Sequence, residues 1–126
     1  MASILIAEDD KFLSSAYRLK FSKKGFTVYI ALDGQDAINI LSTTRPDIIL
    51  LDLVMPVKDG FSVLSELKSN EQFNTIPVII TSNLSQKEDI DKAKGLGAID
   101  FVVKSDVSLD DLVKKVQKIL GISVPV

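Results

Sequence analysis

Five side chains that could do chemistry each follow or close a short apolar run of the sequence. They are the acids Glu8, Asp9 and Asp52, the hydroxyl residue Thr81 and the amine Lys104. Two carboxylates about 4 Å apart repel each other by roughly 4 kcal/mol at an effective dielectric constant of 20. If the three acids meet, we expect a bound divalent cation, and an acid-rich site that keeps some waters suits Mg²⁺. A lysine and a hydroxyl beside such a cation would suit an incoming phosphoryl group.

Each of these residues also has an ordinary structural explanation. Asp52 alone could be a solvated loop acid, the triplet Glu8-Asp9-Asp10 could be no more than a helix start, and Thr81 could be a β-branched strand residue. A solitary lysine is usually a solvated surface charge. The elements that carry these residues decide whether they meet.

The stretch Asp47–Pro56 shows how the chain positions one of the acids. Its aliphatic residues bracket Asp52 and predict a strand that is buried on both faces, with the acid at its carboxyl end. Pro56 ends the strand because proline has no N–H for a ladder. In open α/β sheets, ligands bind at this end of the strands.

Strand-like and helix-like patterns alternate five times along the chain, which predicts a parallel sheet with helices on both faces. With right-handed crossovers, we expect one domain over residues 1–126 with a flavodoxin-like α/β fold, (βα)5 and doubly wound, with its five-stranded sheet in the order 2-1-3-4-5. The switch point of that order lies between the first and third strands, where the acids are. The expected strands are Ser3–Ala7, Phe26–Ala31, a run within Asp47–Pro56, Ile76–Thr81 and Ala98–Val103, and the expected helices lie near 12–19, 37–41, 61–67, 85–95 and 109–120.

The composition excludes several classes of site. The 126 residues contain no cysteine and no histidine, which rules out disulfides, the usual zinc ligands and a histidine base. A formal net charge of −2 gives no broad cationic surface, so we expect no direct nucleic-acid binding. No apolar run approaches membrane-spanning length, and Met1–Ala7 lacks the basic start of a signal peptide. We therefore expect no membrane insertion and a cytoplasmic location.

Four stretches together resemble a known family. They are Ile4–Asp10, Asp47–Pro56 with Asp59-Gly60 after it, Pro77–Ser82 and Gly97–Lys104. In this joint pattern, which spans essentially the whole chain, the sequence is similar to response-regulator receiver domains of two-component signalling, of the CheY-like single-domain type. Each stretch alone is a weak signal, whereas the combination is specific.

The resemblance implies a role for each acid. Asp52 would take a phosphoryl group from a phosphohistidine of a sensor histidine kinase or a phosphotransfer protein. Mg²⁺ would be bound directly by Asp9, by Asp52 and by the backbone carbonyl of Val54, with Glu8 acting through a water molecule.

Three further residues would respond to the phosphoryl group. Thr81 matches the hydroxyl that moves onto it, Lys104 the lysine that pairs with it, and Phe101 an aromatic switch residue. Because residues at odd separations in a strand point to opposite faces, Phe101 should point away from the side that Lys104 uses and towards the fourth helix. When Thr81 moves, we expect it to vacate space that Phe101 can fill.

One position departs from the family. Ser105 stands where family members commonly have proline after the lysine and hold a cis peptide bond. A cis bond to a non-proline residue costs about 2.5–4 kcal/mol. Either the Lys104–Ser105 bond is cis at that cost or the loop is rebuilt, and the placement of Lys104 depends on which of the two holds.

The resemblance implies a signalling switch rather than a classical enzyme. It would catalyse only its own phosphorylation and dephosphorylation, and it would bind a downstream target protein differently in its two states. We expect no effector domain after the helix near 109–120, and therefore output by binding or by passing the phosphoryl group onward. The alternatives are a pseudo-receiver that binds a partner without phosphorylation, and a haloacid dehalogenase-type phosphatase. The latter requires a second aspartate where this chain has Val54.

Overall fold

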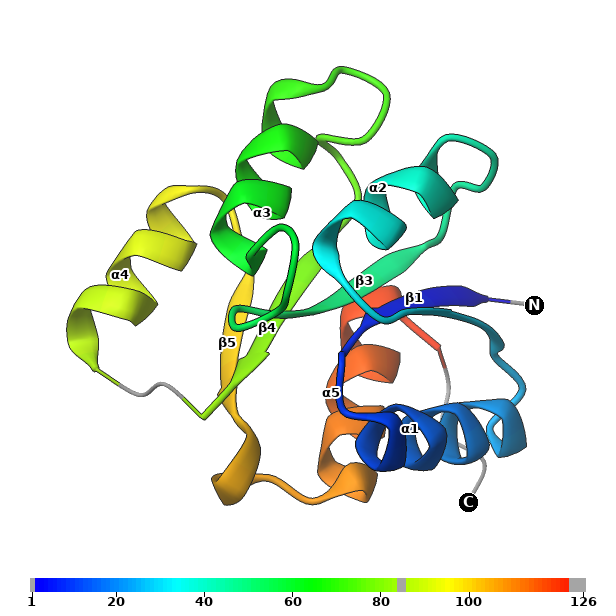
Figure 1. Cartoon of the computed structure of the whole chain (residues 1–126). Coiled ribbons are helices and arrows are strands. Elements are labelled where there is room, and N and C mark those ends of the chain that lie inside the picture. The colour runs from blue at the N-terminus through cyan, green and yellow to red at the C-terminus, as the bar shows by residue number, and fades with distance from the viewer. Residues whose placement is uncertain (1, 84–85, 123–126) are drawn as a thin grey trace.

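Five parallel strands form one sheet at the centre of the computed structural model, which describes residues 2–83 and 86–122. The sheet order is β2-β1-β3-β4-β5, and this confirms the predicted flavodoxin-like α/β fold (Figure 1). All neighbouring pairs are parallel, so the carboxyl ends of the strands open on one edge. The strands are β1 Ser3–Ala7, β2 Thr27–Ala31, β3 Ile48–Asp52, β4 Val78–Ser82 and β5 Asp100–Val103.

Helices cover both faces of the sheet. They are α1 Lys11–Lys23, α2 Gly34–Leu41, α3 Gly60–Ser69, α4 Lys87–Gly95 and α5 Leu109–Leu120, with a 3₁₀ turn, η1 Lys104–Asp106, between β5 and α5. In Figure 1, α1 and α5 lie on one face, and α2, α3 and α4 lie on the other. In the part of the chain that the structure describes, no helix is both long and apolar enough to span a bilayer.

Polar side chains fix where four of the helices begin. Asp10, Asp33, Asp59 and Ser108 each accept hydrogen bonds from backbone N–H groups of the first turn, at the starts of α1, α2, α3 and α5. Such caps are each worth about 1 kcal/mol. Gln86, which precedes α4, makes no side-chain cap bond. The three aspartates lie in the loops that leave β1, β2 and β3, so the caps also order the edge of the sheet where the site lies.

The aliphatic run of β3 is continuous because both of its faces are buried. Ile48 and Leu50 pack into the cluster under α1 and α5, whereas Ile49 and Leu51 pack into the cluster under α2, α3 and α4. β1 divides in the same way between the two clusters. The two central strands therefore hold the residues at their carboxyl ends on a rigid base.

The start of β2 differs by one residue from the sequence prediction. It begins at Thr27 because Phe26 belongs to the end of α1. The Phe26 N–H donates to the Phe21 carbonyl at 3.1 Å, across Gly25 with its φ of 91°. This is the bond of a Schellman helix end, and the Phe21 and Phe26 rings also pack edge to face, 5.3 Å apart.

Two other strands also start later than their apolar runs, each for a local reason. β4 begins at Val78, after the proline in its run. β5 begins at Asp100, because the Ala98 N–H donates to the Ala93 carbonyl at 3.1 Å and so closes α4. The predicted start of the fourth helix at Ser85 lies outside the described residues.

Candidate functional site

Glu8, Asp9 and Asp52 meet at the carboxyl edge of β1 and β3, as the sheet order predicts. The register pairs Ala7 with Leu51, so Glu8 and Asp52 follow on adjacent strands. One carboxylate oxygen from each of the three acids lies within 4.8 Å of the others. Glu8 and Asp52 are only 1% and 5% exposed, whereas Asp9 is exposed. The edge thus gathers three hard oxygen ligands, two of them on buried side chains.

Backbone N–H groups orient the two buried carboxylates. The Asp10 N–H donates to Glu8 Oε2 at 3.1 Å, and the Val54 N–H donates to Asp52 Oδ1 at 3.3 Å. Val54 itself lies in the loop after β3 with its side chain exposed. These bonds leave Glu8 Oε1 and Asp52 Oδ2 for another partner.

Lys104 is that partner. Its Nζ lies 2.9 Å from Asp52 Oδ2 and also donates to Glu8 Oε1. Burial raises the pKa of the Glu8 carboxyl, and the Lys104 ammonium opposes this shift only in part. Burial would lower the pKa of Lys104, but its hydrogen bonds to Glu8 and Asp52 outweigh burial and hold that pKa above its ordinary value. The lysine is therefore a fixed positive charge between two buried acids.

The Lys104–Ser105 peptide bond is trans, as are the other peptide bonds of the described residues. Lys104 is the first residue of the η1 turn, which leads towards α5. Of the two possibilities that the sequence left open, the rebuilt loop is the one that the structure has. It still delivers the lysine to Glu8 and Asp52.

Thr81 lies beside Asp52 in the sheet. The β3–β4 register pairs the two residues, and Thr81 is buried. On its other side, Thr81 pairs with Val102 of β5, and both line a cavity on the face that α1 and α5 cover. The hydroxyl residue is therefore close to the acid, as predicted, and belongs to the α1–α5 side of the sheet.

Phe101 lies on the opposite face. It is half-buried and packs against the cluster that contains Ala93 of α4, whereas the next residue, Val102, belongs to the cluster under α1 and α5. The predicted orientation of Phe101 towards the fourth helix is confirmed. The expectation that Phe101 fills space vacated by Thr81 stays a prediction, because it concerns the movement of Thr81 onto a phosphoryl group.

The loop between β3 and α3 is tight and strained. A Cβ on Gly60 would lie 2.2 Å from the Asp52 carbonyl oxygen, so only glycine allows α3 to begin this close to the site. In the same loop Val57 has a φ of 69°, and the Lys58 N–H donates to the Pro56 carbonyl at 2.7 Å. This is the geometry of a γ-turn of the strained kind, and a β-branched residue fits it poorly. Strain of this type gathers at functional loops.

Two further residues shape the surroundings of the site. A Cβ on Gly34 would lie 1.9 Å from the Lys58 carbonyl oxygen, so the start of α2 packs directly under the strained loop. Tyr17 of α1 is buried, and burial raises its pKa to about 12. In the sequence, the Asp33-Gly34 pair predicts a turn, but it does not predict the close contact between Gly34 and Lys58. Nothing in the sequence distinguishes Tyr17 from an ordinary residue of a helix stripe.

Residues 4–117 match the response regulator receiver domain family. The chain belongs to this family. The transcriptional regulatory protein AfsQ1 of Streptomyces coelicolor is 37% identical to it over 106 residues, which cover 82% of this chain and 45% of that protein. The receiver domain described here therefore spans about half the length of this curated relative.

Solved receiver structures agree with the fold. The receiver domain of the Francisella response regulator 1452 is 31% identical, with a TM-score of 0.87, over 96% of this chain and 98% of that one. The Mn(2+)-bound form of response regulator Rcp1 is 30% identical, with a TM-score of 0.82, over 100% of both chains. The resemblance that the sequence motifs indicated is thus confirmed at the level of family and fold.

Proposed function

We propose that this receiver domain is a phosphoacceptor switch in which Asp52 takes a phosphoryl group from a phosphohistidine of a histidine kinase or a phosphotransfer protein. The observation that carries the proposal is the cluster at the sheet edge. Asp52 ends the central strand, Lys104 contacts its Oδ2 atom, and Glu8 and Asp9 complete an acidic pocket around it. Membership of the receiver family supports the same reading.

Asp52, Lys104 and Thr81 each have a separate role in the transfer of the phosphoryl group. A carboxylate oxygen of Asp52 attacks phosphorus, and the P–N bond to the partner's imidazole breaks as the P–O bond forms. Lys104, which holds Asp52 Oδ2 beforehand, pairs with a phosphoryl oxygen afterwards because its ammonium has only donors to offer. The Thr81 hydroxyl, beside Asp52 in the sheet, donates to another phosphoryl oxygen. Catalysis is then positioning and charge neutralisation, limited to the domain's own phosphorylation and dephosphorylation.

The acidic pocket fits Mg²⁺. Carboxylate and backbone carbonyl oxygens are the ligands that this cation prefers, and it commonly keeps several waters. We assign Asp9, Asp52 and the Val54 carbonyl as direct ligands and Glu8 as a ligand through water. A bound Mg²⁺ would neutralise the negative charge that the phosphoryl group brings to the two buried acids. The Mn(2+)-bound form of a relative at 30% identity supports a divalent cation in this family.

Phosphorylation would change what the domain binds. We assign Thr81 and Phe101 as the switch residues, one on each face of the sheet, with a downstream target protein as the reader of the two states. Phe101 packs towards α4, which buries only Ala93 among its described side chains and is the helix that can shift at least cost. We place this exchange in the cytoplasm, without direct nucleic-acid contact or membrane insertion.

The direct test is phosphorylation by a small phosphodonor. With acetyl phosphate and Mg²⁺, we expect the intact mass to rise by one phosphoryl group, and the increase should be lost on mild base treatment and absent in EDTA. The variant Asp52→Asn should show no increase. Asp59→Asn is the matched control, because it changes an acid in the same loop and asparagine keeps the helix cap. A parent protein that stays unmodified with Mg²⁺ present would favour the pseudo-receiver alternative.

Magnesium binding has its own readout. Because a ligand that binds only the folded state stabilises it, Mg²⁺ at 100 times its dissociation constant should add about 2.7 kcal/mol to the free energy of unfolding. Asp9→Asn should lose most of this gain, since it removes the exposed ligand without disturbing the Lys104 contacts. Thermal melts with Mg²⁺ and with EDTA measure the difference. Superimposable melts of the parent protein would show that the pocket holds no cation.

A further inference from the structure

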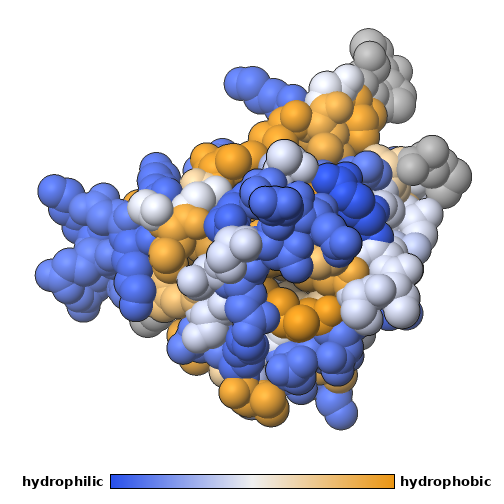
Figure 2. Space-filling view, turned by 90° about the horizontal axis from the view of Figure 1, so that it is seen from above, coloured by the Kyte–Doolittle hydropathy of each residue, from blue (hydrophilic) through white to orange (hydrophobic). Residues whose placement is uncertain are grey.

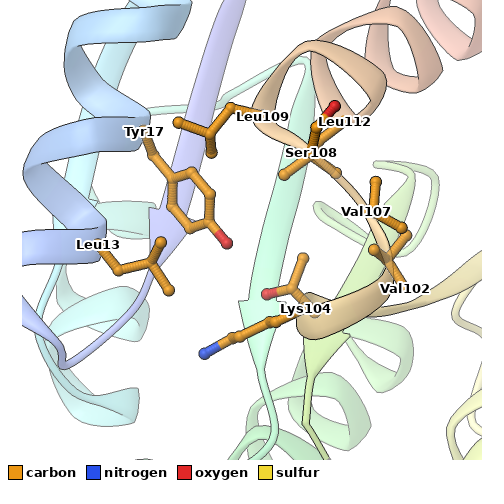
Figure 3. A pocket seen from close by; sticks show the side chains of 9 residues that line it. Leu13, Tyr17, Val102, Lys104, Val107, Ser108, Leu109 and Leu112 are labelled. Carbon is orange, nitrogen blue, oxygen red and sulfur yellow. The ribbon is translucent and has the colours of Figure 1, made fainter.

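The candidate site has different neighbours on the two faces of the sheet. On the α1–α5 face it adjoins a cavity of about 170 Å³, which Tyr17, Thr81 and Lys104 help to line (Figure 3). That cavity shares Thr81 and Lys104 with the site. On the other face, the loop from β3 to α3, residues 53–59, passes against the start of α2 (Figure 1), where two stretches of backbone meet directly.

Gly34 and Lys58 form this backbone contact. A Cβ built on Gly34 would lie 1.9 Å from the carbonyl oxygen of Lys58, 2.7 Å from its carbonyl carbon and 2.8 Å from its Cβ. Ordinary contacts of a Cβ begin at 3.4 Å, so any side chain at this position requires the loop or the helix to move. The two nearest atoms belong to the backbone and cannot rotate away as the end of a flexible side chain can.

The start of α2 is the more firmly fixed side of this contact. The Asp36 N–H donates to the capping oxygen Oδ1 of Asp33 at 2.7 Å. At the end of β2, the Ala31 carbonyl accepts a hydrogen bond from the Glu8 N–H at 2.9 Å, which ties the turn before α2 to the strand that leads into the site. Gly34 is buried behind these bonds. We therefore expect the loop, rather than the helix, to yield to a side chain at position 34.

The loop opposite Gly34 leads back to Asp52 within a few residues. The Lys58 N–H donates to the Pro56 carbonyl at 2.7 Å, and this bond holds Val57 at its unfavourable φ of 69°. Nearer the strand, the Val54 N–H donates to Asp52 Oδ1 at 3.3 Å. A β-branched residue at such a φ has little conformational freedom left, so a displaced Lys58 carbonyl would carry the residues before it along.

We propose that Gly34 is a positioning residue of this site. By admitting the Lys58 carbonyl against its α-carbon, it holds the β3–α3 loop where the Val54 carbonyl can bind Mg²⁺ beside Asp52. The inference rests on the proposed function, which assigns that carbonyl as a ligand. Gly34 is not a ligand itself, so its effect passes through the loop. Small displacements matter here, since a misplacement of about 1 Å can cost about 100-fold in rate.

The first measurement requires neither a metal nor a phosphodonor. In amide NMR spectra of the metal-free protein, Gly34→Ala should shift the signal of Val54, whose N–H donates to Asp52, together with those of residues 55–58. Gly95→Ala is the matched control and should leave these signals in place, because a Cβ on this glycine of α4 would meet no atom within 4 Å. Shifts in Gly34→Ala that stop at Lys58 and never reach Val54 would contradict the proposal.

The second measurement is the Mg²⁺ affinity of the same proteins, obtained by calorimetric titration. Gly34→Ala should weaken Mg²⁺ binding about tenfold, as the loss of support around a metal site commonly does, while Gly95→Ala should bind as the parent does. Equal affinity in a folded Gly34→Ala protein and the parent would overturn the proposal. If the parent itself binds no Mg²⁺, the proposed function fails, whereas the metal-free spectra still decide whether Gly34 positions the loop.

A second substitution tests whether the effect passes through the loop. Glycine adopts a φ of 69° and many other backbone conformations without strain, so Val57→Gly lets the loop absorb a displaced Lys58 carbonyl. The double variant Gly34→Ala/Val57→Gly should therefore bind Mg²⁺ within about twofold of Val57→Gly alone. If Gly34→Ala does not fold, the double variant should fold and bind. A double variant that neither folds nor binds better than Gly34→Ala would place the conflict outside the loop and refute the proposal.

Discussion

α4 and α5 flank β5 on opposite faces of the sheet and are held in very different ways. α5 buries Leu112, Val113, Val116 and Gln117, and the Ser108 side chain caps its start. α4 buries only Ala93 among its described side chains and begins without a side-chain cap. Figure 2 shows hydrophilic side chains at the left of the view, on the side of the molecule where α4 lies in Figure 1.

The difference indicates which side of the domain can move. α5 is further tied to the sheet through Lys115, whose Nζ lies 2.6 Å from Asp100 Oδ2 in β5. Among the described residues, the comparable contact of α4 is that of the Lys92 ammonium, which lies 4.2 Å from the centre of the Phe61 ring of α3. Regions with few buried apolar contacts open at the lowest free energy. A phosphoryl-dependent shift should therefore appear at α4 and leave the α1–α5 side in place.

The largest expected difference is in the loss of stability when a phenylalanine on each face of the sheet is replaced by alanine. Phe21 of α1 is fully buried, so Phe21→Ala should cost about 3–5 kcal/mol of the free energy of unfolding. Phe101, half-buried beside α4, should lose clearly less than about 3 kcal/mol by the same reasoning. Urea titrations of both variants measure this. If the two losses are equal, Phe101 is an ordinary core residue and its assignment as a switch fails.

A smaller contrast compares the helices directly. Val116→Ala in α5 removes a fully buried side chain and should cost about 2 kcal/mol. Ile90→Ala in α4 should cost less than about 1 kcal/mol, because the side chain is half-buried and alanine has the higher helix propensity. Chemical unfolding gives the two values, and amide hydrogen exchange should be faster in α4 than in α5. Equal protection of the two helices from amide hydrogen exchange would contradict the idea that α4 is less stably packed than α5.

The smallest expected effect concerns the ion pair between Asp100 of β5 and Lys115 of α5. Burial raises the pKa of the Asp100 carboxyl, but its bonds to Lys115 and to the Phe101 N–H outweigh burial and hold that pKa below 3.8. The unfolded chain therefore binds a proton first as pH falls, so the contribution of Asp100 is present above pH 3.8 and is lost as pH falls through the folded pKa.

The variant Asp100→Asn tests the contribution of this ion pair to stability. Because the pair is partly exposed, the variant should lose less than about 1 kcal/mol near pH 7. Its stability should converge with that of the parent at acidic pH, as measured by urea midpoints across the pH range. Asp91→Asn, at an exposed position of α4, is the control and should change neither value. A difference that persists undiminished in acid would show that the substitution destabilises the fold for a reason other than charge.

Much of this protein is determined by its sequence alone. The alternation of apolar runs and helix stripes is local, and right-handed crossovers then leave few possible sheets. The gathering of Glu8, Asp9 and Asp52 follows from it, because parallel strands end on one edge. Caps such as Asp10 and the aliphatic run of β3 are equally visible, since each depends on residues a few positions apart.

Only the tertiary structure decided how distant residues meet. Lys104 and Glu8 are 96 positions apart, and their contact depends on the turn that follows β5. The separation of Thr81 from Phe101 depends on the register of β4 against β5. The cavity at Tyr17 exists because two helices from opposite ends of the chain do not fill the space between them. Local patterns fix elements, whereas contacts of this kind depend on how whole elements pack, and packing is set by all of their side chains together.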